Sequence, residues 1–92
     1  MITFEEALKK ANEIKSGIDC GTEFENGYIF DKKDEQNGEI RYGGLLPIHM
    51  FKKNGEVVPS ITFMLGNSGE PVKNFELQKD GTWKDTPYVE ND

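Results

Sequence analysis

The chain has 92 residues, of which 17 are acidic and 11 are basic, and its formal net charge is −6 at neutral pH. A chain of this length forms one domain with a modest core, and its negative charge disfavours binding to nucleic acid or to anionic membrane surfaces. Its single cysteine, Cys20, excludes an intrachain disulfide framework and a multi-cysteine zinc site.

The N-terminal residues, MITFEEALKK, place acidic side chains where a secretory signal carries basic ones. No stretch of the sequence approaches the roughly 20 apolar residues that span a bilayer. We therefore expect a cytoplasmic protein.

The first predicted element is a helix from about Thr3 to Ser16. Thr3 and Glu6 have the spacing of a capping box, and Lys15 followed by Gly17 predicts the end of the helix. A helix of this length is marginal alone, so we expect it to pack on a sheet. The apolar residues that recur at helical spacing and predict its buried stripe are Phe4, Ala7, Leu8, Ala11 and Ile14.

The sequence after Gly21 has the patterns of strands and turns. In EFENGYIFD, two-residue alternation predicts one strand with Phe24, Tyr28 and Phe30 on a common face and an interruption at Asn26. A charged segment then leads to a predicted hairpin turn at Asn37-Gly38, which is followed by a short strand with Ile40 and Tyr42.

Two further segments predict strands. Residues Leu45 to Phe51 are apolar on both faces, which is typical of a strand that is covered on both sides or lies at a tight bend. EVVPSITFML has the clearest alternation, and Pro59, which lacks an N–H, places that strand at an edge or a bulge. We expect Ile61 and Phe63 to pack against the N-terminal helix.

The C-terminal part predicts a turn in GNSGEP, a strand in VKNFELQ and a reversal at Asp80-Gly81. The polar residues from about 85 onward are expected to fray. These elements predict one α+β domain over residues 1–92, with one N-terminal helix packed on an antiparallel sheet of four to five strands. The other sheet face would carry Glu25, Arg41 and Lys73.

His49 and Cys20 are the residues with most potential for chemistry. Nucleophilic catalysis would need a thiolate activated by a base, and nothing in their spacing requires the two residues to meet. One histidine and one cysteine are too few for a zinc site without several carboxylates, and the sequence lacks calcium and phosphate loops. We predict no catalytic, metal or cofactor site. The alternative is a small ligand-binding module or enzyme with a pocket around His49, Tyr42 and Cys20.

Three segments, ITFEEALKKANE, GYIFD and GGLLPIHMFKKNGEV, resemble the small immunity proteins of bacterial polymorphic toxin systems, notably the YrhB-like group. The resemblance implies a non-enzymatic protein that binds and neutralises a cognate toxin protein.

The acidic charge favours a basic protein as that partner, since complementary charge speeds encounter. Aromatic side chains would supply most of the affinity. The residues predicted to contact the partner are Tyr28, Asp31, Asp34, Glu35, Glu39, Tyr42 and Trp83.

Overall fold

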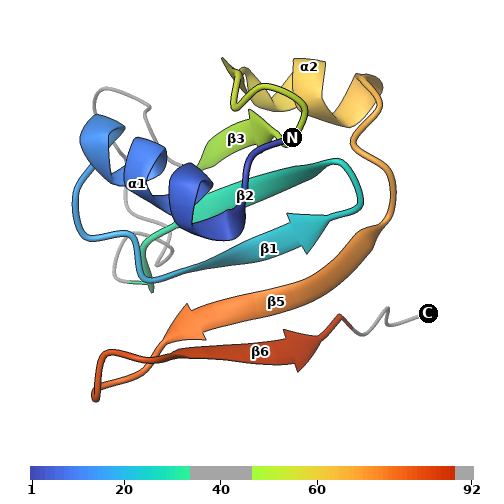
Figure 1. Cartoon of the computed structure of the whole chain (residues 1–92). Helices are drawn as coiled ribbons and strands as arrows, with labels where there is room; N and C mark the ends of the chain where they lie inside the picture. Colours follow the sequence, from blue (N-terminus) through green and yellow to red (C-terminus); the bar gives the residue numbers. More distant parts are fainter. Residues whose placement is uncertain (34–46, 89–92) are drawn as a thin grey trace.

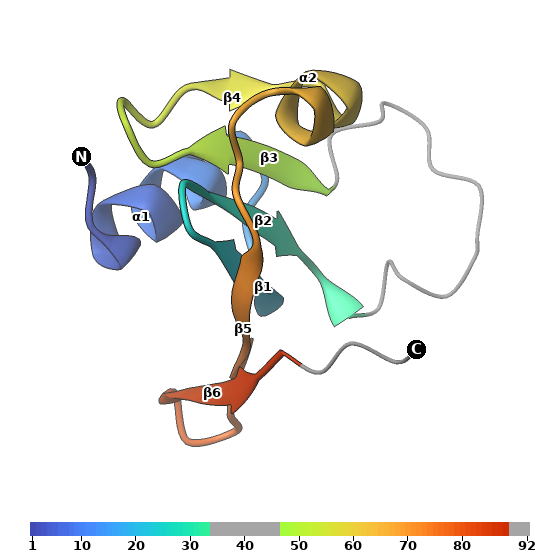
Figure 2. The ribbon, with the colours of Figure 1, turned by 90° about the vertical axis from the view of Figure 1, so that its right-hand side faces the viewer.

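The computed structural model describes residues 1–33 and 47–88. It has an α+β fold in which a six-stranded antiparallel sheet carries one helix on each face, as Figures 1 and 2 show. The strand order is β4-β3-β2-β1-β5-β6, so the sheet has more strands than the predicted four to five. The elements are α1 (Phe4–Ile14), β1 (Cys20–Phe24), β2 (Gly27–Asp31), β3 (Ile48–Phe51), β4 (Val57–Val58), α2 (Ser60–Leu65), β5 (Pro71–Leu77) and β6 (Trp83–Pro87).

The predicted N-terminal helix is confirmed as α1. The Thr3 hydroxyl oxygen accepts the backbone N–H of Glu6 at 3.2 Å, and the Glu6 carboxylate accepts the backbone N–H of Thr3 at 3.0 Å. This reciprocal capping box satisfies two donors that the first turn leaves without helical partners. The helix ends at Ile14, and Gly17 adopts a positive φ of 85° shortly after it.

The main core lies between α1 and the sheet. Ala7 and Ala11 are fully buried, and their small side chains bring the helix close to the strands. Gly21 on β1 leaves room for the Phe75 ring of the neighbouring strand, because a Cβ at position 21 would lie 2.6 Å from that ring. The other buried members of this core are Ile18, Tyr28, Phe30, Ile48, Met50 and Phe75. Ile14 is partly exposed and does not belong to it.

The prediction of one strand across EFENGYIFD is wrong. Residues Glu25 and Asn26 turn the chain, so that β1 and β2 form an antiparallel hairpin with Glu23 opposite Tyr28. The reversal puts Phe24 on the opposite sheet face from Tyr28. Phe24 instead contacts Phe63, with ring centroids 5.3 Å apart.

The prediction of a long strand across EVVPSITFML is also wrong. Only Val57 and Val58 pair with β3, and Pro59 then serves as the N-cap of α2 with φ −61°. Proline tolerates the start of a helix because the first N–H groups have no helical partner. Phe63 is fully buried on the face away from α1, so the predicted packing of α1 on Ile61 and Phe63 does not occur.

β3 confirms the strand predicted within residues 45–51 and its covering on both faces. Ile48 and Met50 are buried on the α1 side, whereas His49 and Phe51 pack against Phe63 of α2. The turn predicted at Asn37-Gly38 and the strand with Ile40 and Tyr42 lie outside the described residues.

The reversal predicted at Asp80-Gly81 is confirmed. The Asp80 carboxylate accepts the backbone N–H of Thr82 at 3.0 Å, and Gly81 has a positive φ of 89°. β6 then pairs with β5 as far as Pro87, so residues 85–87 belong to the sheet instead of fraying. In the described part of the chain, no helix is long and apolar enough to cross a membrane.

Candidate functional site

Cys20 begins β1 and is buried, with Asp31 of β2 and Glu76 of β5 as its strand partners. Burial raises the pKa of its thiol to about 12, and the nearby carboxylates of Asp19 and Asp31 add to this effect. A thiol with such a pKa is protonated at neutral pH, whereas a nucleophilic cysteine needs a lowered pKa.

His49 lies on β3, next to the edge strand β4, and is buried. Burial lowers the pKa of its imidazole, and a hydrogen bond with the backbone of Pro47 partly opposes that shift. The register places His49 opposite Ile29 and Ile29 opposite Thr22, so β2 separates His49 from the strand that carries Cys20. Two strand spacings amount to about 10 Å, which is too far for a histidine to take a proton from the thiol directly.

Of the predicted partner-binding residues, the structure describes Tyr28, Asp31 and Trp83, and these three do not share one exposed surface. Tyr28 is buried in the core, where it offers a partner little area, and Trp83 is half-buried beside Phe4. Asp31 is buried on the opposite face of the sheet from Tyr28, and its carboxylate accepts the backbone N–H of Lys32. The remaining predicted contacts, Asp34, Glu35, Glu39 and Tyr42, lie outside the described residues.

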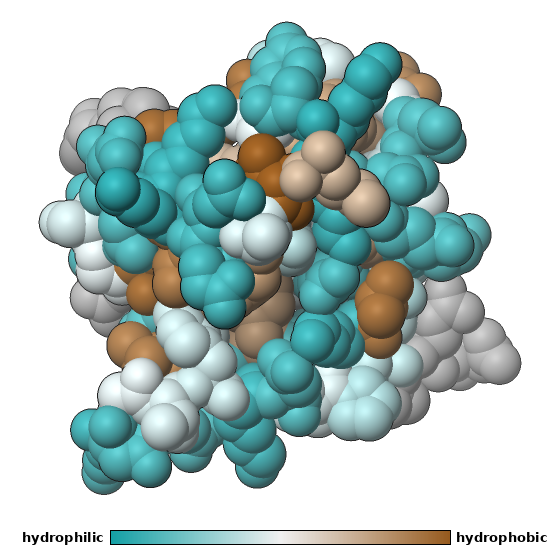
Figure 3. Space-filling view, viewed as in Figure 1, coloured by the Kyte–Doolittle hydropathy of each residue, from teal (hydrophilic) through white to brown (hydrophobic). Residues whose placement is uncertain are grey.

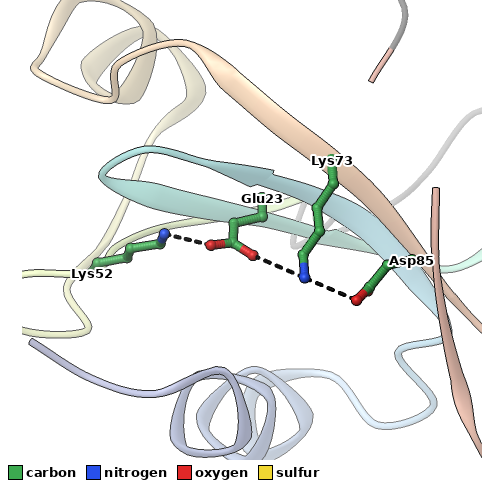
Figure 4. Close-up of polar contacts among 4 residues, drawn as sticks. All are labelled: Glu23, Lys52, Lys73 and Asp85. Carbon is green, nitrogen blue, oxygen red and sulfur yellow. Dashed lines mark hydrogen bonds and ion pairs between the residues drawn. The ribbon is translucent and has the colours of Figure 1, made fainter. Parts of the chain in front are cut away.

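A row of four alternating charges crosses the α1 side of the sheet (Figure 4). The Glu23 carboxylate lies 2.6 Å from the Lys52 ammonium and 3.7 Å from that of Lys73. Lys73 is also 2.9 Å from the carboxylate of Asp85, which with Glu23 raises the pKa of the lysine. The prediction that Lys73 lies on the sheet face away from the N-terminal helix is therefore wrong, and its charge is compensated by Glu23 and Asp85 on the α1 side.

A cleft of about 280 Å³ lies beside this row, between the start of α1 and strands β5 and β6. Its lining residues are Phe4, Glu5, Leu8, Glu23, Lys73, Phe75, Trp83 and Asp85. The walls are apolar and aromatic, while the charged groups of Glu23, Lys73 and Asp85 already pair with each other. This pairing lowers their capacity to bind a charged ligand.

The sheet face away from α1 holds a second hollow, of about 420 Å³, which Cys20, Thr22 and Asn74 help to line. The Thr22 hydroxyl donates to the Asn74 side-chain oxygen at 2.7 Å across β1 and β5. Among the residues that the structure describes, no group of three or more histidine, cysteine or carboxylate side chains is arranged to hold a metal ion.

Among the described residues, helix α2 carries the most exposed large apolar side chains after the N-terminal Met1. Ile61, Met64 and Leu65 are 66%, 62% and 81% exposed. Monomeric proteins seldom leave neighbouring apolar side chains in water without a function for them. The sequence prediction missed this surface because a strand would have turned Ile61 and Leu65 to the same side as Phe63. The spacing of 61, 64 and 65 is the helical signal that could have found it.

The α1 side of the molecule is different. Figure 3 shows a mostly hydrophilic surface there, on which apolar residues form small separate patches. The described residues thus place their clearest apolar surface on α2, behind the sheet from α1 (Figure 2).

No family model, no curated protein and no solved structure matches this chain.

Proposed function

We propose that this is a non-enzymatic immunity-type protein that binds and neutralises a cognate toxin protein with a basic surface. The resemblance of three sequence segments to such immunity proteins supports the proposal. The observation that carries it is the excess of acidic over basic residues in two segments of the sequence, 34–46 and 89–92.

The described residues are nearly balanced in charge. Five of the 17 acidic side chains and one of the 11 basic ones lie in segments 34–46 and 89–92, so these two segments hold −4 of the net −6. Six of the charged side chains in the described residues form ion pairs, Lys52 with Glu23, Lys73 with Asp85, and Lys33 with Glu76.

Such a distribution suits electrostatic docking. A concentrated excess of one sign attracts a partner of the other sign over a distance and speeds association, whereas internally paired charges contribute little. The acidic residues that supply most of this excess are Asp34, Glu35, Glu39, Glu90 and Asp92. Trp83 and Tyr42 are the aromatic side chains that we expect to contact the partner, whereas Tyr28 is buried and offers it little area.

The test is a pull-down from the native host with the full chain as bait, followed by mass spectrometry and co-expression of the recovered protein. We expect a basic protein that salt releases from the bait, that is toxic when expressed alone and that is harmless when expressed with this chain. An acidic or neutral partner, or a basic partner without toxicity, would overturn the proposal.

Two variants separate this proposal from the enzyme or ligand-binding alternative. Cys20→Ser and His49→Gln should protect cells as well as the original chain does, because neither side chain lies on an acidic docking surface. Loss of protection by a folded variant would favour the pocket around His49 instead.

A further inference from the structure

We infer that helix α2 and the acidic turn beside it form the contact surface that anchors a basic protein partner. The surface consists of the apolar side chains of Ile61, Met64 and Leu65 and the carboxylates of Glu25 and Glu70. This inference rests on the proposed function for the nature of the partner, and it adds where the partner binds and which chemistry it must present.

Phe63 fixes the orientation of α2. Its ring is fully buried and stacks on Phe51 at a centroid distance of 5.3 Å, while Phe24 meets it edge-on from β1. Gly27 leaves room for it, since a Cβ at that position would lie 2.4 Å from the Phe63 ring. With Phe63 held inward, the helical spacing turns Ile61, Met64 and Leu65 outward.

The chain that follows α2 is fixed as well. The backbone N–H of Asn26 donates to the Ser68 carbonyl oxygen at 2.9 Å, and the Asn26 side chain donates to the Asn67 carbonyl oxygen at 2.9 Å. These bonds attach the segment after α2 to the β1–β2 turn. The apolar stripe is therefore held in place before binding, and a partner loses less conformational entropy in docking on it.

The same attachment brings the backbones of two glutamates, Glu25 and Glu70, next to each other after α2. Glu25 accepts the backbone N–H of Glu70 at 2.7 Å, and a Cβ at Gly69 would lie 2.7 Å from the Glu25 Cβ. Both glutamates are exposed, and within the described part of the chain neither pairs with a lysine.

The chemistry of this surface, apolar side chains with two exposed glutamates that form no ion pair among the described residues, indicates the kind of partner that fits it. Interfaces place apolar anchors at their centre and polar groups at the rim. The matching partner surface is an apolar patch flanked by lysine or arginine, which is the surface of a basic protein. The α2 stripe would slow dissociation, whereas the acidic segments of the chain would speed association.

The experiment is an NMR titration of the isotope-labelled full chain with a synthetic amphipathic helical peptide that has leucines on one face and flanking lysines. We expect shift changes at residues 61–70 and at Glu25. The double variant Ile61→Ser/Leu65→Ser should raise the Kd about tenfold, as for the loss of interface anchors. Glu70→Gln should raise it about twofold to threefold, since exposed charges contribute little each.

Matched controls come from α1, on the other side of the sheet. Ile14→Ser removes a partly exposed apolar side chain there, and Glu13→Gln removes an exposed charge. Both should leave the Kd unchanged. A peptide with glutamates in place of the lysines should bind about tenfold more weakly. If the double variant is destabilised, Leu65→Ser alone replaces it, because that side chain is the most exposed of the three.

Three outcomes would overturn the inference. The first is a set of shift changes elsewhere in the chain that persists in the serine variants. The second is equal binding of the peptide with glutamates in place of lysines. The third is a concentration-dependent dimer that the serine variants abolish, which would show that the apolar side chains of α2 bind a second copy of the chain. The titration needs no toxin, so its failure leaves the proposed function standing. A failed pull-down would in turn leave the peptide result intact.

Discussion

Phe63 meets His49 edge-on, with ring centroids 5.3 Å apart, on the sheet face opposite α1. This contact joins the chain's only histidine to the only fully buried side chain of α2. It gives the sheet a second, smaller core that is separate from the one under α1. The stability of α2 depends on this core, because a six-residue helix is too short to be stable alone.

Removal of the Phe63 ring should strongly destabilise the protein. We expect Phe63→Ala to lower the free energy of unfolding by about 3 to 5 kcal/mol, the usual cost of truncating a buried phenylalanine. Leu65→Ala on the same helix is the control, and its effect should stay within about 0.5 kcal/mol because the side chain is exposed. Urea melts of both variants measure the difference. Equal midpoints would show that α2 has no core of its own.

The burial of His49 should make stability depend on pH. Its pKa is lowered in the folded state, so as the pH falls below about 6.5 the unfolded chain binds this proton more readily than the folded one. Stability is therefore greatest above that pH and declines until the pH has passed the folded pKa. His49→Gln should flatten the profile between about pH 7.5 and 5.5. An unchanged slope in the variant would contradict the burial of a neutral imidazole.

The raised pKa of Cys20 should suppress its reactivity. With a pKa of about 12, the thiol has far less thiolate at pH 8 than an ordinary cysteine, so an aromatic disulfide reagent should react roughly a thousandfold more slowly with the native chain. In denaturant the rate should return to that of free cysteine. If Cys20 reacts with the reagent at nearly the same rate in the native and the denatured chain, its thiol is not buried.

The row of charges on the α1 side should contribute unequally to stability. Glu23→Gln leaves the largely buried ammonium of Lys52 without its carboxylate, and we expect a loss of about 1 to 3 kcal/mol. Lys33→Met breaks the more exposed pair with Glu76 and should cost less than about 1 kcal/mol. Thermal melts at low and high salt test the contrast, because salt screens the exposed pair more strongly.

The sequence predicted those elements whose determinants are local. The capping box of Thr3 and Glu6 and the apolar stripe that begins at Phe4 are formed by residues close together in sequence, at α1. The turn at Asp80 is stabilised by the side chain of Asp80 itself. These elements were confirmed. The strand within residues 45–51 was also confirmed, because apolar residues on both faces require cover from two sides.

The wrong predictions concern elements that distant contacts decide. Six residues such as SITFML fit strand alternation and helical spacing equally well, and the choice falls to Phe63, whose partners Phe24 and Phe51 lie far away in sequence. β6 is polar and lies at the sheet edge, so it lacks the apolar alternation that reveals a strand. The exposed apolar surface of α2 was not predicted, because residues 60–65 were predicted to form a strand and not a helix.

The last prediction concerns the rate at which the partner binds. Segments 34–46 and 89–92 hold most of the net negative charge, and exposed charges act over a Debye length of about 8 Å at physiological salt. Association with the basic toxin should therefore slow as salt is added, while dissociation, governed by apolar anchors, should change little. Asp34→Lys/Glu35→Lys reverses two of these charges and should reduce both the rate and its dependence on salt.

Exposed charge pairs are worth only about 0 to 1 kcal/mol each, so the reversal should slow association without abolishing binding. Lys79→Glu/Lys84→Glu provides a control, since it changes two exposed charges of the β5–β6 hairpin in the opposite direction and should not slow association. Stopped-flow or biosensor rates give the measurement. Association rates that ignore both salt and the Asp34 and Glu35 reversal would remove the electrostatic argument, and the α2 surface would then have to account for recognition through its apolar contacts alone.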